Sequence, residues 1–143
     1  TDIIGQGYRV SGVDSSPSLI EVCSEHFPEH DWVVADMRTV HFDKKFDGVL
    51  AWDSFFHLNH EDQAKMFDVF ERYGKAGAPL MFSAGPDEKG VAVNPLWGEP
   101  LYHATYSKAE YVDLFTRYGF KLVEHVFSDD ACGGRTIYLA VKS

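Results

Sequence analysis

Two hydrophobic patterns alternate along this chain. Short continuous runs of apolar residues, rich in β-branched and aromatic side chains, predict strands, whereas apolar residues recurring every three to four positions predict helices. Strands are expected over 8–14, 32–35, 46–51, 80–83, 120–127 and 136–142, and helices over 16–26, 60–73 and 107–118. This alternation predicts an α/β fold.

Polar residues mark where the helices begin. Ser16 followed by Pro17 is typical of a helix start, as is Asn59, and Ser107 with Glu110 three residues later has the spacing of a capping box. Apolar residues within the helices predict the faces that pack on the sheet. They are Ile20, Cys23, Phe27, Met66, Phe67, Phe70, Tyr73, Tyr111, Leu114, Phe115 and Tyr118.

The last third of the chain contains two further features. Residues 84–106 are polar and rich in glycine and proline, so we expect a long excursion that serves as a lid or substrate loop. The last two strands are joined by residues 128–134. A parallel return needs a longer crossover, so these strands are expected to form an antiparallel hairpin.

Composition narrows the possible functions. A length of 143 residues supports one domain over 1–143, and a net charge of −9 argues against nucleic acid as a partner. We find no run long enough for a membrane span, and two cysteines favour a reducing cytoplasm. His57 and His60 have helical ligand spacing but no third ligand at a matching offset, so no metal site is predicted.

Candidate chemistry lies where two strands end. Asp14 closes the run 8–14, and Asp36 follows the next strand twenty-two residues later, the length of one strand–helix–strand unit. In open α/β sheets, ligands bind at the carboxyl edge, where a carboxylate accepts both hydroxyls of a ribose. The alternative is that each acid only stabilises the turn that follows its strand.

These segments resemble the class I S-adenosylmethionine-dependent methyltransferases. The segments that carry the resemblance are 8–17, 35–38, 46–57 and 119–120. The resemblance implies a three-layer, Rossmann-like, mostly parallel sheet with a terminal antiparallel hairpin. It also implies methyl transfer from S-adenosylmethionine to a small-molecule acceptor.

The resemblance assigns roles to individual residues. Asp14 and Ser15 match the family's ribose-binding turn, and Asp36 and Met37 match the segment that contacts adenine. Residues 52–57 match the loop that covers the methionine part of the cofactor. In that loop, Trp52 either stacks near the cofactor or fills the core, and Asp53 either orients an amine or caps a turn.

Other residues are candidates because of their own chemistry. His57 and His103 are nominated for proton transfer, since imidazole titrates near neutrality; the alternative is that both are polar surface. Trp97, Tyr102 and Tyr106 either line a substrate pocket or pack the loop.

Part of the family pattern is not found in this sequence. The family's first strand and its glycine-rich loop would precede Thr1, so we expect the domain to be truncated at its amino terminus. The missing strand lies centrally in the family's sheet, and a homo-oligomer that fills this slot is one possibility. Two other functions stay open, a nicotinamide-dependent oxidoreductase and a non-catalytic binding or oligomerisation module.

Overall fold

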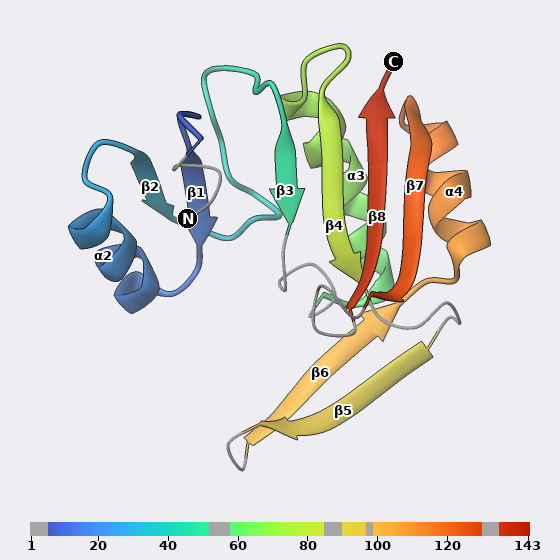
Figure 1. Cartoon of the computed structure of the whole chain (residues 1–143). Coiled ribbons are helices and arrows are strands. Elements are labelled where there is room, and N and C mark those ends of the chain that lie inside the picture. The colour runs from blue at the N-terminus through green and yellow to red at the C-terminus, as the bar shows by residue number, and fades with distance from the viewer. Residues whose placement is uncertain (1–5, 52–57, 85–89, 97–98, 130–134) are drawn as a thin grey trace. The chain divides into compact units, whose positions relative to one another are not determined.

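The chain divides into two compact units, Thr1–His41 and Phe42–Ser143, in its computed structural model (Figure 1). The residues that the structure describes are 6–51, 58–84, 90–96, 99–129 and 135–143. That the two units form one domain stays a prediction.

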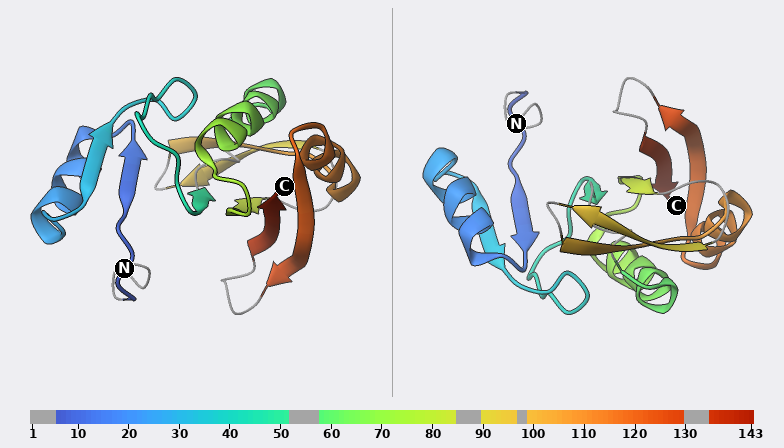
Figure 2. Two further views of the ribbon diagram at one scale, coloured as in Figure 1. Left: turned by 90° about the horizontal axis from the view of Figure 1, so that it is seen from above. Right: turned by 90° about the horizontal axis from the view of Figure 1, so that it is seen from below.

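The first unit is one strand–helix–strand unit. Strands β1 (Ser11–Asp14) and β2 (Asp31–Val34) pair in parallel, with Ser11 opposite Asp31 and Asp14 opposite Val34. Helix α2 (Pro17–His26) connects them and flanks the pair (Figure 2). The predicted start of this helix is confirmed, because the Ser16 side chain accepts a hydrogen bond from the Leu19 N–H.

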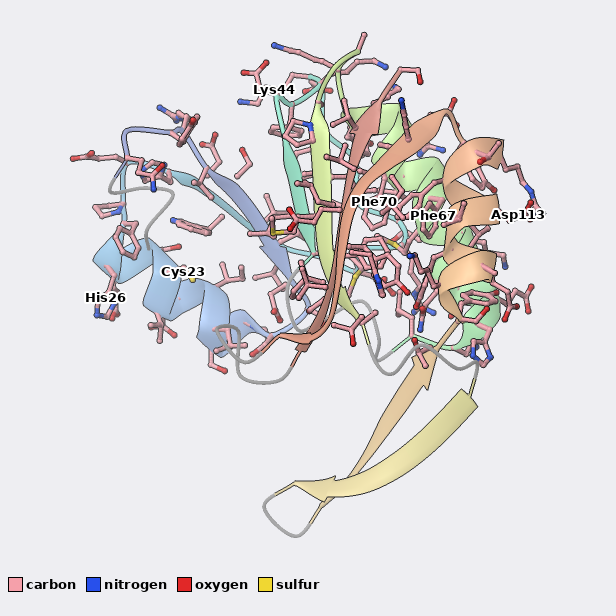
Figure 3. All side chains as sticks on the ribbon, turned by 45° about the vertical axis from the view of Figure 1, so that its right-hand side comes forward. Cys23, His26, Lys44, Phe67, Phe70 and Asp113 are labelled. Atoms are coloured by element: carbon pink, nitrogen blue, oxygen red, sulfur yellow. The ribbon has the colours of Figure 1, made fainter. Side chains whose placement is uncertain are left out.

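Helix α2 packs less tightly than its sequence predicts. Ile20 is buried, whereas Cys23, labelled in Figure 3, and Phe27 are only half-buried. Strand β1 is also shorter than predicted, because Tyr8 to Val10 precede the ladder with β2, whereas β2 has the predicted length and begins one residue earlier.

Gly12 makes room for an indole ring in the first unit. Trp32 lies opposite Gly12, and its Nε1 donates a hydrogen bond to the Phe27 carbonyl at 2.8 Å. A Cβ atom added at Gly12 would lie 2.4 Å from Cζ3 of Trp32. The anchored ring therefore requires a residue without a side chain at this position.

We expect Gly12→Ala to lower the free energy of unfolding by about 1–3 kcal/mol, because the methyl group overpacks the site. Urea unfolding followed by circular dichroism measures the effect. Gly48→Ala is the matched control, since its Cβ would meet Pro79 Cγ at an ordinary 3.6 Å. Equal stability of the two variants would contradict the argument.

The second unit contains a mixed sheet in the order β3-β4-β8-β7. Strands β3 (Val49–Ala51) and β4 (Pro79–Ala84) are parallel. Strands β7 (Phe120–Asp129) and β8 (Arg135–Lys142) form the predicted antiparallel hairpin, and β8 also pairs with β4. Strand β3 is shorter than predicted, since Phe46 makes only an isolated bridge to Gly74.

Two helices cover one face of this sheet. They are α3 (His60–Tyr73) and α4 (Lys108–Arg117), and both begin at the predicted caps. The Asn59 side chain accepts from the Asp62 N–H at 2.8 Å, and Ser107 and Glu110 form the capping box.

The core of the second unit is aromatic. Phe67 has 0% of its surface exposed, and its ring lies 6.0 Å from that of Phe82 and 5.5 Å from that of Phe115. Phe67 and Phe70 are labelled in Figure 3. Phe82 also stacks on Tyr138 at 5.2 Å, so rings from both helices and from the two central strands form one cluster.

The segment 84–106, predicted to be a lid or substrate loop, contains two strands. β5 (Gly90–Leu96) and β6 (Glu99–Thr105) pair in antiparallel register and run side by side in Figures 1 and 2. These two strands were not predicted, and the role of residues 84–106 as a lid or substrate loop stays a prediction. Pro95 lies opposite Pro100, and among the described residues neither strand pairs with a third one, so the missing N–H groups cost no ladder to a further strand.

Candidate functional site

Asp14 is the last residue of β1, and its own turn orients its carboxylate. Oδ1 accepts a hydrogen bond from the Ser16 N–H at 2.8 Å, which is an Asx-turn leading into α2. Within the described ranges, Oδ2 has no hydrogen-bond partner. Asp14 is half-buried and Ser15 is exposed. One oxygen of the carboxylate is thus fixed while the other is an open acceptor.

Asp36 lies at the same edge of the sheet as Asp14. β2 ends at Val34, directly opposite Asp14, and the Ala35 N–H donates to the Asp14 carbonyl at 3.0 Å. Asp36 is the next residue along the chain. Because the two strands are parallel, both acids follow carboxyl ends of neighbouring strands.

A tight turn follows Asp36. The Thr39 N–H donates to the Asp36 carbonyl at 3.1 Å, and the Arg38 N–H donates to Asp36 Oδ1 at 2.9 Å. Hydrogen bonds from the Arg38 side chain lower the pKa of Asp36 to about 2. The Met37 N–H has no acceptor among the residues described, so it is available to a ligand.

The other predicted site residues belong to the second unit. Trp52, Asp53, His57 and Trp97 lie outside the described residues. For His103 the structure gives only its place in the backbone, opposite Ala92 in the β5–β6 ladder. The roles predicted for these residues stay predictions.

Tyr106 has a structural partner that the sequence did not indicate. Its hydroxyl donates to the His60 carbonyl at 2.6 Å, and the two rings lie 4.9 Å apart. His60 Nε2 in turn lies 2.7 Å from the Thr105 carbonyl, which can only accept, so Nε2 carries the proton. These contacts fix the end of β6 to the first turn of α3 and favour the loop-packing alternative for Tyr106.

A buried polar pair joins the two helices nearby. The Tyr111 hydroxyl donates to Gln63 Oε1 at 2.7 Å, and Gln63 Nε2 donates to the Leu58 carbonyl at 2.9 Å. Both side chains are fully buried, and burial raises the pKa of Tyr111 to about 12. Gln63 is not among the residues predicted to be buried, although its position three and four residues before Met66 and Phe67 places it on the apolar face of α3.

Among the described residues, none of the helices is long and apolar enough to cross a membrane.

Comparisons with known proteins identify the family of the chain. The family described as "Methyltransferase domain" matches residues 2–77, more than half of the chain. The chain therefore belongs to the methyltransferase-domain family, and the predicted membership of the class I S-adenosylmethionine-dependent methyltransferases is confirmed. No curated protein matches the chain.

Solved structures share its fold. An amino pentose methyltransferase from Micromonospora echinaspora, solved with S-adenosylmethionine, matches at 13% identity and a TM-score of 0.77, over 99% of this chain and 78% of that one. An S-adenosylmethionine-dependent methyltransferase from Clostridium acetobutylicum matches at 11% identity and a TM-score of 0.79, with the same coverage.

A third structure is 1,6-didemethyltoxoflavin-N1-methyltransferase from Burkholderia thailandensis, with bound 1,6-didemethyltoxoflavin and S-adenosylhomocysteine. It matches at 14% identity and a TM-score of 0.76, and the 99% of this chain that aligns spans 64% of its length, just under two thirds. These likenesses confirm the predicted α/β, Rossmann-like fold class.

Proposed function

We propose that this domain transfers a methyl group from S-adenosylmethionine to a small-molecule acceptor. The observation that carries the proposal is the placement of Asp14 and Asp36 at the carboxyl ends of two neighbouring parallel strands. Ligands of open α/β sheets bind along this edge. Membership of the methyltransferase-domain family supports the same reaction.

The groups at this edge fit an adenosine. A ribose presents two hydroxyl donors, and Asp14 offers an unpaired oxygen on a carboxylate that Ser16 already holds in place. Asp36 is an ionised acceptor suited to the amino group of adenine, and the free Met37 N–H is suited to a ring nitrogen. Ser15, which is exposed in the turn after β1, is the fourth residue of this edge that we propose to bind the cofactor.

The residues of the chain contribute binding and orientation. When bound, S-adenosylmethionine supplies a methyl group on a sulfonium, which passes in line to a nucleophilic atom while the sulfur keeps the electron pair of the broken S–C bond. Asp14 and Asp36 hold the adenosine end, so that the reactive end keeps a fixed position. Trp52 and Asp53 are proposed to contact its methionine part, and His57 and His103 to take up the proton of the acceptor.

Two observations bear on the class of acceptor. Two of the structural neighbours act on small molecules, an amino pentose and 1,6-didemethyltoxoflavin. The β5–β6 hairpin follows β4 at its carboxyl end and is proposed to contact the acceptor of this domain. We place the domain in the cytoplasm because two cysteines do not form a disulfide framework.

Titration calorimetry of the full-length protein with S-adenosylhomocysteine tests the proposal. We expect saturable binding at one site and no heat from NADH. Binding of NADH instead would support the oxidoreductase. Absence of binding by either ligand, together with a defined dimer in light scattering, would support a non-catalytic module.

A further inference from the structure

Arg38 donates hydrogen bonds to both carboxylate oxygens of Asp36. Its Nε lies 3.0 Å from Oδ1 and 3.1 Å from Oδ2, and its Nη2 lies 2.5 Å from Oδ2. The backbone N–H of Arg38 donates to Oδ1 as well, at 2.9 Å. Two side-chain donors and one backbone donor of a single residue thus hold one carboxylate.

These contacts restrict what Asp36 can offer to a ligand. A carboxylate has about four acceptor positions. Arg38 supplies three donors: its backbone N–H contacts Oδ1, its Nη2 contacts Oδ2, and its Nε is shared between both oxygens. About one acceptor position of the carboxylate therefore remains for a ligand. The turn closed by Thr39 fixes the backbone from which this side chain extends.

We propose that Arg38 is a positioning residue for adenine recognition, which holds the Asp36 carboxylate so that its remaining acceptor meets the exocyclic amino group. The inference rests on the proposed function, because it assumes that Asp36 binds adenine. Arg38 acts through Asp36 and need not touch the cofactor. Its role is to set the direction of one acceptor before the ligand arrives.

The electrostatics of the pair support this role. Arg38 keeps the pKa of Asp36 at about 2, so the carboxylate stays ionised and accepts without donating. The neighbouring strand brings Asp14, a second acid, to the same edge. A fixed, ionised acceptor favours an amino group and repels the carbonyl oxygen that replaces it in hypoxanthine.

The ion pair between Arg38 and Asp36 contributes little to the stability of the fold. The side chains of Arg38 and Asp36 are 44% and 40% exposed, and surface pairs of this kind contribute little to folding. A second exposed ion pair lies at the other end of the two strands, where Arg9 Nη2 is 3.4 Å from Asp31 Oδ1. The variant Arg9→Gln is therefore a matched control, because it removes the same charge at a position away from the candidate site.

The test compares Arg38→Gln, Arg38→Lys and Arg9→Gln in the full-length protein. Calorimetry measures the affinities for S-adenosylhomocysteine and for its deaminated analogue, S-inosylhomocysteine. We expect Arg38→Gln to weaken binding of S-adenosylhomocysteine by about two- to tenfold, the effect of freeing one or two side chains. The ratio of the two affinities should fall as well, since a carboxylate that rotates no longer distinguishes the two bases.

A second readout needs no cofactor. Titration of the Asp36 carboxyl group by NMR should show a higher pKa in Arg38→Gln than in the wild type, because the hydrogen bonds that lower it are lost. Arg38→Lys keeps the charge without the planar fork, so we expect the pKa to stay low while the affinity ratio still falls. Arg9→Gln should change neither quantity.

The outcomes separate this inference from the function on which it rests. If the wild type does not bind S-adenosylhomocysteine, or if Asp36→Asn binds it unchanged, both adenine recognition by Asp36 and the role of Arg38 are overturned. If Asp36→Asn binds weakly but Arg38→Gln keeps the wild-type affinity ratio, only the positioning role is wrong. An equal effect of Arg9→Gln would also overturn it, because the effect would then depend on charge alone.

Discussion

Replacing Phe67 by alanine is expected to lower the free energy of unfolding by about 3–5 kcal/mol, the usual cost of deleting a buried aromatic ring. Phe67 is completely buried, and its ring contacts those of Phe70, Phe82, Phe115 and Tyr118. These neighbours come from two helices and a central strand, so the surroundings cannot close over the cavity by moving one side chain. Urea unfolding followed by circular dichroism measures the loss.

Val123→Ala is the control for this measurement. Val123 is 58% exposed on the edge strand β7, and its truncation is expected to change stability by less than about 0.5 kcal/mol. A loss below about 1 kcal/mol for Phe67→Ala would show that the aromatic cluster does not form the core of the second unit.

Asp14→Asn is expected to weaken binding of S-adenosylhomocysteine by about 10- to 100-fold while leaving the fold intact. The loss corresponds to one hydrogen bond to a charged group, about 1.5–3 kcal/mol. The asparagine Oδ1 can still accept from the Ser16 N–H, so the turn into α2 is preserved. Calorimetry measures the affinity, and circular dichroism checks the fold.

Asp31→Asn removes the same charge at the opposite end of the strand pair, where Asp31 faces Ser11. Its ion pair with Arg9 is exposed and spans 3.4 Å, so we expect unchanged binding and little change in stability. Unchanged affinity in Asp14→Asn would remove Asp14 from the site. A similar loss in both variants would point to an effect of net charge.

The helices were predicted well from the sequence because the residues that begin and end them act on neighbours within one turn. The caps at Ser16, Asn59 and Ser107 act within one turn of the chain, and Gly119, which follows α4, adopts a φ of 80° that favours glycine. The buried face of α3 followed from its 3.6-residue period.

The β5–β6 hairpin was missed because its sequence has a composition typical of loops. Glycine and proline usually interrupt strands, and Pro95 and Pro100 are consistent with regular pairing because they face each other in a ladder that, in the part of the chain that the structure describes, has two strands only. No property of either segment alone indicates that partner.

The sequence by itself determined the order and type of the helices, the final hairpin and the two acids that end β1 and β2, since each depends on neighbours within a few residues. Only the tertiary structure decided that β8 lies between β4 and β7, that Gln63 pairs with Tyr111, and that Arg38 holds Asp36. The first two join residues far apart in the chain, and hydrophobic periodicity carries no information about such pairings. The third depends on the side-chain conformation that the turn after β2 imposes.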